Sequence, residues 1–359
     1  MWKTSEGSTG RLIQLCIGYF TFYVITGVSV KYFTGSSSLG FPGMKELEYL
    51  VYSTIGGNLI CLVVVFGLRW YRLASNKIIS IGSFKIPQEA LYIIPSGICT
   101  AIVIPTTTLM YTLPISVMVA MVIMRASVII ISRIVDAIQI RQGILKKKLY
   151  REENIAVVFA LLAAAVHIVW VGSGDFDFVN SPAAVTILAS YIVAYSIRIY
   201  LMNYYKNTRA QGVKLDNNGF FAIEQIVASI VMLAAGYILF NSTEWFQTGN
   251  EQILIFHNAV ASPQPLWILA IVIGMAYGLV AFFSVFIFMF KGRTATFAGL
   301  VNRLTSLVAG TMATLVSFFV FGGKLPKTQD WVSLVFILIA VGFLTLAEKK
   351  RVRELTPPN

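Results

Sequence analysis

Ten apolar runs make up most of the chain, and each run is long enough to cross a lipid bilayer as a helix. A spanning helix needs about 20 predominantly apolar residues, and mostly short polar segments separate these runs. The runs are 12–33, 48–68, 89–112, 114–137, 155–172, 183–205, 219–240, 266–290, 295–320 and 330–347. We therefore predict an all-α integral membrane protein with ten transmembrane helices.

The composition excludes a water-soluble fold. Hydrophobic residues make up 57% of the chain and charged residues 12%, whereas soluble domains carry about 25% charged residues. The formal net charge of +12 is explained by basic loops on one side of a membrane, so we expect no nucleic-acid partner. Cys16, Cys61 and Cys99 lie inside apolar runs without paired spacing, so we predict no disulfide framework, no metal site and no cofactor.

Lysine and arginine residues are concentrated in alternate loops. The N-terminal segment, the loops at 69–88, 138–153, 206–218 and 291–294 and the C-terminal tail hold 20 of the 28 basic residues, and the loops between them hold three. Because cytoplasmic loops collect lysine and arginine, both termini are predicted to be cytoplasmic. The choice between a bacterial inner membrane and an organelle membrane stays open.

The two halves of the chain align weakly when Arg125 is placed on Arg303, and the fifth apolar run then falls on the tenth. An odd number of helices in each half turns the second half upside down relative to the first. Such inverted repeats are typical of secondary transporters, whose substrate sites lie near the membrane midplane. We predict two inverted five-helix repeats, 1–173 and 174–359, in one membrane domain with no soluble domain.

Ten helices in a five-plus-five arrangement with short loops resemble the drug/metabolite transporter superfamily, in particular its EamA-like, nucleotide-sugar and sugar-phosphate branches. In the nucleotide-sugar branch the ninth helix often opens with a Gly-Ala-Leu-Asn-Lys motif that contacts the substrate. Residues 298–303 read AGLVNR here, with arginine in place of lysine and one residue inserted. The resemblance implies that Asn302 and Arg303 contact the substrate.

Two arginines lie deep inside predicted spans, Arg125 in the fourth and Arg303 in the ninth. A charge that faces lipid at this depth costs ~2.5–3.5 kcal/mol, so such residues face a bundle interior or a water-filled cavity. The guanidinium group presents a planar set of donors that matches carboxylate or phosphate. The functional interpretation is an anionic substrate held between Arg125 and Arg303. The structural alternative pairs Arg125 with Glu224.

Four further residues are candidates for the substrate path. Tyr191, Tyr195 and Arg198 recur at i, i+4 and i+7 on one face of the sixth helix, where they either line a cavity or pack against neighbouring helices. Glu224 lies inside the seventh span. It is the carboxylate that we favour for proton coupling, if transport is proton-driven.

Other polar and small residues of the spans have structural interpretations. Arg133 and Asp136 lie at i, i+3 near a helix end and are expected to form an ordinary ion pair. Lys31 lies near the outer end of the first helix and is expected to extend its amine to the membrane interface. Gly274 and Gly278 form a small-xxx-small pattern, which predicts a close helix contact.

The sequence thus predicts a secondary transporter that moves a small organic anion, phosphorylated or nucleotide-linked, by alternating access. A lipid-phosphate flippase and a metabolite or drug exporter of the same fold are the alternatives. An enzyme is disfavoured because the longest basic loops, 69–88 and 138–153, hold no catalytic set: Glu152 and Glu153 lie beside Arg151 and look like a solvated helix start, and no phosphate-binding glycine loop occurs. The expected partners are a small-molecule substrate and the lipid bilayer, and a homodimer is left open.

Overall fold

The computed structural model describes residues 7–112, 117–146, 149–169, 181–247, 249–322 and 325–355, and helices dominate these ranges. The all-α prediction is therefore confirmed. The helices are α1 (Thr9–Phe33), α2 (Glu46–Gly67), α3 (Ala90–Thr112), α4 (Val117–Arg141), α5 (Arg151–Val169), α6 (Pro182–Asn207), α7 (Asn217–Trp245), α8 (Glu251–Ala261), α9 (Trp267–Phe288), α10 (Ala295–Phe321) and α11 (Thr328–Leu355), with a short 3-10 helix η1 (Ser37–Leu39). Strands β1 (Ile78–Ile81) and β2 (Phe84–Pro87) form one antiparallel hairpin.

Each of the ten predicted runs coincides with a long helix. Eight helices of the described chain, α1, α2, α3, α6, α7, α9, α10 and α11, are long and apolar enough to cross a membrane. These eight establish a multi-pass membrane protein. The helix α8 was not predicted, and the predicted Leu113-Pro114 turn and the repeat boundary after residue 173 lie outside the described residues.

Large apolar side chains cover the outside of the bundle. Phe319 is 77% exposed, Leu233 72% and Ile230 61%. Monomeric soluble proteins rarely expose contiguous apolar surface on this scale, whereas lipid tails solvate it without cost. The outer surface thus agrees with a helix bundle embedded in a bilayer.

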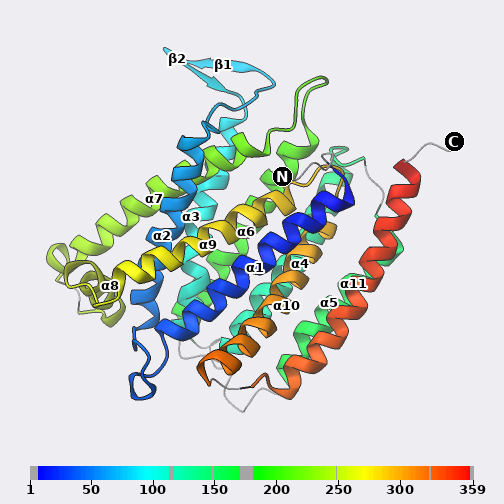
Figure 1. Ribbon diagram of the computed structural model, residues 1–359. Helices are drawn as coiled ribbons and strands as arrows, with labels where there is room; N and C mark the ends of the chain where they lie inside the picture. The colour runs from blue at the N-terminus through cyan, green and yellow to red at the C-terminus, as the bar shows by residue number, and fades with distance from the viewer. Residues whose placement is uncertain are drawn as a thin grey trace.

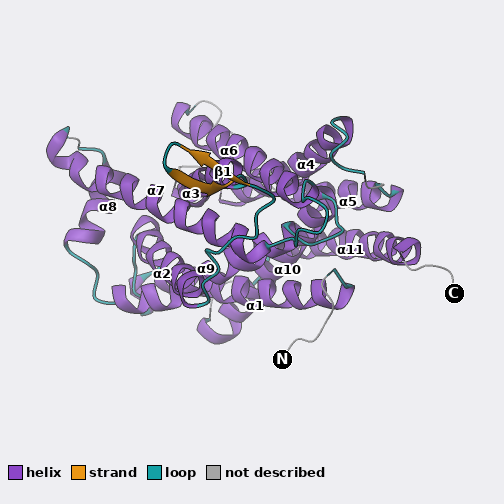
Figure 2. Ribbon diagram, turned by 90° about the horizontal axis from the view of Figure 1, so that it is seen from above, coloured by secondary structure: helices purple, strands orange, loops and turns teal. Residues whose placement is uncertain are grey.

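The start of α1 and the end of α11 lie at the same end of the bundle, together with the β1–β2 hairpin (Figure 1). We call this end the terminal face. The connection between α1 and α2 and the short helix α8 lie toward the opposite end, which we call the distal face. Seen from the terminal face, α5 and α11 lie side by side at one edge of the bundle, and α7 and α8 lie at the other (Figure 2).

Most extensive helix contacts join the first five helices to the later ones. The helix α1 packs against α9 and α10, and α2 packs against α9. Correspondingly, α6 packs against α3 and α4, and α7 packs against α3. The helices α4 and α10 cross each other, and α5 packs along α11. The interior of the protein is therefore built mainly from contacts between the two halves of the chain.

Glycines allow α2 and α9 to approach until their backbones touch. A Cβ placed on Gly56 would lie 1.9 Å from the carbonyl oxygen of Ile271, and one on Gly278 would lie 2.2 Å from that of Gly57. These distances are far below any van der Waals contact, so the backbone would have to move. The close contact predicted from Gly274 and Gly278 is confirmed.

Substitution of Gly278 with alanine is expected to destabilise the protein by ~1–3 kcal/mol, the usual cost of overpacking a close contact. Thermal unfolding in detergent measures this effect. Gly342→Ala is the matched control, because Gly342 lies on α11 and a Cβ added there would have no neighbouring atom within 4 Å, and alanine favours a helix. Equal melting temperatures for the two variants would contradict the close contact.

Candidate functional site

A cavity of about 520 Å³ lies between the two halves of the chain. Side chains from α1, α2, α3, α4, α5, α9, α10 and α11 line it. Lys31 and Glu46, at the α1–α2 end of the cavity, are exposed, whereas Arg125 and Tyr23 lie farther along their helices toward the terminal face. The cavity therefore extends from the distal face into the middle of the bundle.

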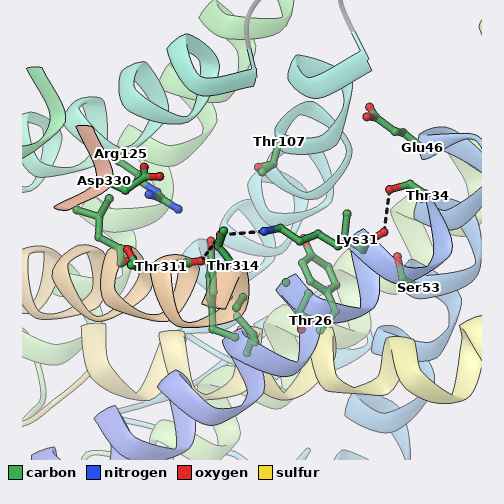
Figure 3. Close-up of a pocket in the computed structure, with 18 of the residues that line it drawn as sticks. Thr26, Lys31, Thr34, Glu46, Ser53, Thr107, Arg125, Thr311, Thr314 and Asp330 are labelled. Atoms are coloured by element: carbon green, nitrogen blue, oxygen red, sulfur yellow. Dashed lines mark hydrogen bonds between the residues drawn. The ribbon is translucent and has the colours of Figure 1, made fainter. Parts of the chain in front are cut away.

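The polar lining carries both signs of charge and many hydroxyl groups (Figure 3). In the close-up, Arg125 and Asp330 lie at one end and Glu46 at the other. Lys31 lies between them, and its amine donates a hydrogen bond of 2.8 Å to the Thr314 hydroxyl. The hydroxyl-bearing residues that line the cavity are Tyr23, Thr26, Thr34, Tyr49, Ser53, Thr107, Tyr277, Thr311, Thr314 and Ser333.

Arg125 is the deepest cation of the cavity. Its guanidinium group lies beside Gly310 of α10, 3.6 Å from the place of a Cβ on that glycine. Among the described residues, none forms a hydrogen bond or an ion pair with Arg125, although Asp330 lines the same cavity. A charged group inside a membrane protein is costly unless it is paired or hydrated. The cavity therefore offers a guanidinium group whose donors no described residue occupies, near the carboxylate of Asp330.

Arg303 lies one turn closer to the terminal face than Leu307, the first residue of α10 that lines the cavity. Its Nη2 donates a hydrogen bond of 2.7 Å to the Tyr195 hydroxyl, and its Cζ lies 5.2 Å from the centre of the Tyr195 ring. Its buried Nε has no hydrogen-bond partner in the described part of the chain. The hydroxyl and the ring face of Tyr195 thus lie beside the guanidinium group where a carboxylate would neutralise its charge.

Asn302 is fully buried beside Arg303. Its amide nitrogen donates to the Ser284 hydroxyl at 3.0 Å, and its amide oxygen accepts from the Tyr19 hydroxyl at 3.4 Å. These bonds join α10 to α9 and to α1. In this conformation Asn302 and Arg303 form a polar layer between the cavity and the terminal face.

The aromatic face of α6 is buried in the bundle. The Tyr191 hydroxyl donates to the carbonyl oxygen of Met124 at 3.5 Å, and Tyr195 accepts from Arg303 as described above. The two tyrosines of the predicted stripe are therefore packed against α4 and α10. Neither tyrosine lines the cavity in this conformation, so their contact with substrate stays a prediction.

Arg198 and Glu224 form a buried bidentate ion pair. Arg198 Nε donates to Glu224 Oε1 and Nη2 donates to Oε2, both at 3.0 Å, and the Ser96 hydroxyl donates to Oε1 at 2.6 Å. The partner of Glu224 is thus Arg198, and the alternative that paired Glu224 with Arg125 was wrong. Proton coupling through Glu224 stays a prediction. A proton that binds this carboxylate would compete with the two donors of Arg198 and the hydroxyl of Ser96.

The structure corrects the ion pair that we expected between Arg133 and Asp136 at i, i+3. Its two carboxylate oxygens accept hydrogen bonds from the backbone N–H groups of Ala295 and Thr296 at 2.8 and 2.7 Å. These groups form the first turn of α10, where the helix dipole favours a negative charge. Arg133 forms no ion pair with Asp136, and its Nη1 has no hydrogen-bond partner among the described residues. A contact between helices therefore replaced the local one.

A buried charged network closes the terminal face, and we call it the terminal network. Glu348 accepts hydrogen bonds from Thr9, Arg293 and Arg351, and Arg351 also donates to Glu153. These residues belong to α1, the α9–α10 loop, α11 and α5. Burial raises the pKa of Glu153 despite Arg351, and burial lowers the pKa of Arg293 despite Glu348. In both groups desolvation outweighs pairing, so the network closes the face with little net electrostatic gain.

Sequence reasoning misplaced one residue of the cavity and its surroundings and missed four others. Lys31 was expected to reach outward, but its amine lies in the cavity; Glu46 and Asp330 were not considered. Tyr19 and Tyr23 on α1 repeat the i, i+4 spacing of Tyr191 and Tyr195 on α6. A comparison of the first and sixth apolar runs would have found that signal. For the carboxylates no such signal exists, because both lie at helix starts that look solvated.

Comparisons with known proteins match the fold alone. No family model and no curated protein sequence matches the chain. A crystal structure of another protein is similar with a TM-score of 0.53, covering 96% of this chain and 99% of that one, at 12% sequence identity. Fold and cavity together define a multi-pass helical membrane protein whose central cavity carries charged and hydroxyl-bearing side chains on a mainly apolar lining.

Proposed function

We propose that this protein is a secondary transporter that moves a small organic anion through the central cavity by alternating access. The observation that carries the proposal is Arg125, a guanidinium group inside a membrane helix that lines the cavity without an acidic partner among the described residues. Arginine binds carboxylate and phosphate through several parallel hydrogen bonds. A ligand with a carboxylate or phosphate group would neutralise the charge of the Arg125 guanidinium group.

The pattern of helix contacts supports two inverted repeats, α1–α5 and α6–α11 without α8. In this arrangement the helices α1, α2, α3, α4 and α5 correspond to α6, α7, α9, α10 and α11. The contact α1–α9 then corresponds to α6–α3, α1–α10 to α6–α4 and α2–α9 to α7–α3, and all of these contacts occur. The pairs α4–α10 and α5–α11 convert into themselves. Pseudo-symmetric halves that meet around a midplane site are the architecture by which secondary transporters alternate their access. This architecture also requires α4 and α5 to cross the membrane, which makes ten spans.

We infer from the distribution of basic residues that the terminal face is cytoplasmic. The cavity then opens to the outside or to a lumen, and the polar layer at Arg303 and the terminal network close the cytoplasmic side. Transport would require the reverse arrangement, with the distal end closed and the network broken. The resemblance to the drug/metabolite transporter superfamily fits this mechanism, and the substrate within that class is open.

Arg125→Ala is expected to reduce uptake of the transported anion by at least about tenfold, because a charge-assisted bidentate contact is lost. Purified protein in sealed liposomes would be tested with sugar phosphates, nucleotide sugars and carboxylates, after a thermal-shift screen for ligands that stabilise it. Arg133→Ala is the matched control, since Arg133 lies on the same helix outside the cavity.

Arg303→Ala is measured in the same assay and is expected to abolish transport. Stabilisation by cations or neutral solutes that survives both Arg125→Ala and Arg303→Ala would reject anion transport. Movement of a labelled phospholipid without uptake of any soluble anion would instead establish the flippase alternative.

A further inference from the structure

Two tyrosine pairs occupy equivalent places in the two halves of the chain. Tyr19 and Tyr23 lie at i, i+4 on α1, and their ring centres are 5.5 Å apart. Tyr191 and Tyr195 lie at i, i+4 on α6, and their ring centres are 5.1 Å apart. The helices α1 and α6 are the first of their respective sets, and each one packs against the fourth helix of the other set.

The first tyrosine of each pair bonds the residue at the same place in the other half, in one case through its side chain and in the other through its backbone. The Tyr19 hydroxyl donates to Asn302, the residue directly before the deep arginine of α10, at 3.4 Å. The Tyr191 hydroxyl donates to the carbonyl oxygen of Met124, the residue directly before the deep arginine of α4, at 3.5 Å. The first tyrosine of each half therefore contacts the residue directly before the arginine of the other half.

The second tyrosine of each pair breaks this equivalence. Tyr195 accepts a hydrogen bond of 2.7 Å from Arg303 and offers its ring face to the same guanidinium group. Tyr23 lines the cavity together with Arg125, but no hydrogen bond joins these two described residues. The arginine on the closed side is thus held by its tyrosine, and the arginine on the open side is not.

We propose that Tyr23 and Tyr195 are alternating partners of the two arginines. When the protein opens to the terminal face, Tyr195 releases Arg303 to the cavity, and Tyr23 takes up Arg125 on the side that closes. This proposal rests on the alternating access proposed above, because the two inverted halves then exchange their conformations. A guanidinium group that loses its hydration in the closed half needs a hydrogen-bond acceptor and a ring face, and the tyrosine supplies both.

Accessibility of two single cysteines to a water-soluble maleimide tests the exchange on the full chain in nanodiscs. Thr311→Cys reports the cavity, and Thr296→Cys reports the terminal face, where Thr296 is fully buried in this conformation. The natural Cys16, Cys61 and Cys99 are replaced by alanine in every variant. No substrate is needed, so the measurement does not depend on knowing what is transported.

The two equivalent substitutions are expected to act in opposite directions. Tyr195→Phe removes a bond of the present conformation, so labelling at position 296 rises and labelling at position 311 falls, each by roughly tenfold, the factor for one hydrogen bond to a charged group. Tyr23→Phe removes a bond of the alternative conformation and shifts both rates the other way. Tyr237→Phe, on an exposed part of α7, is the control and leaves both rates unchanged.

Shifts in the same direction for Tyr23→Phe and Tyr195→Phe would overturn the proposal, and so would a Tyr23→Phe variant that behaves like the control. The double variant loses one bond in each conformation and is expected to return toward the wild-type ratio. If opposite shifts occur without uptake of any anion, the exchange stands and the transported class is wrong. If anions are taken up but the shifts are parallel, transport stands and the exchange fails.

Discussion

Glu224→Ala is expected to lower the free energy of unfolding by about 3–5 kcal/mol, the cost of removing one partner from a buried ion pair. Glu224 is fully buried, and both of its oxygens bind Arg198 at 3.0 Å. Without the carboxylate, the Arg198 guanidinium group would remain inside the bundle with its charge uncompensated. Thermal unfolding of the purified protein in detergent measures the loss.

The exposed Lys350–Glu152 pair provides the matched control. Glu152→Ala removes the same charge, but surface ion pairs contribute only ~0–1 kcal/mol, so the melting temperature should change little. The double variant Arg198→Met/Glu224→Met is expected to recover most of the loss, since apolar residues of similar volume often replace a buried pair without cost. Equal losses for Glu224→Ala and Glu152→Ala would show that the buried pair is hydrated or mobile.

Glu348→Gln is expected to open the terminal face. Glu348 is the acceptor for Thr9, Arg293 and Arg351 in the terminal network, and glutamine keeps the shape of the side chain while removing its charge. Burial already outweighs pairing at Arg293, whose pKa is lowered, so the loss of the carboxylate leaves a desolvated cation that only opening can hydrate. Labelling of the Thr296→Cys reporter should accelerate by roughly tenfold or more.

Glu354→Gln separates this effect from a general loss of charge on α11. Glu354 lies on the same helix and is exposed, with one hydrogen bond of 2.6 Å from the Tyr150 hydroxyl. Its substitution should leave the labelling rate unchanged. An unchanged labelling rate in Glu348→Gln would show that the terminal network does not control the opening of this face.

The helices and their positions could be predicted from local sequence, and the physical reason is the bilayer. A backbone segment in hydrocarbon must satisfy its own hydrogen bonds, so a run of about 20 apolar residues has to be a helix. Helix α8 was not predicted because its 11 residues are too few to span a bilayer.

The depth of Arg125 and Arg303 also followed from local sequence, but their surroundings did not. Glu224 forms its ion pair with Arg198 instead of Arg125. Asp136 accepts hydrogen bonds from the first turn of α10 instead of pairing with Arg133. Each choice depends on which helices face each other, and apolar runs of similar length contain no information on that.

Residue types and spacing therefore determined that this chain crosses a membrane many times and carries arginines in its interior. Only the tertiary structure decided which arginine lines the cavity and which one is held by tyrosine. Hydrophobic burial positions a helix in the bilayer by itself, whereas hydrogen bonds and ion pairs require donors and acceptors within about 3 Å. Such distances arise only after helices from both halves of the chain have packed together.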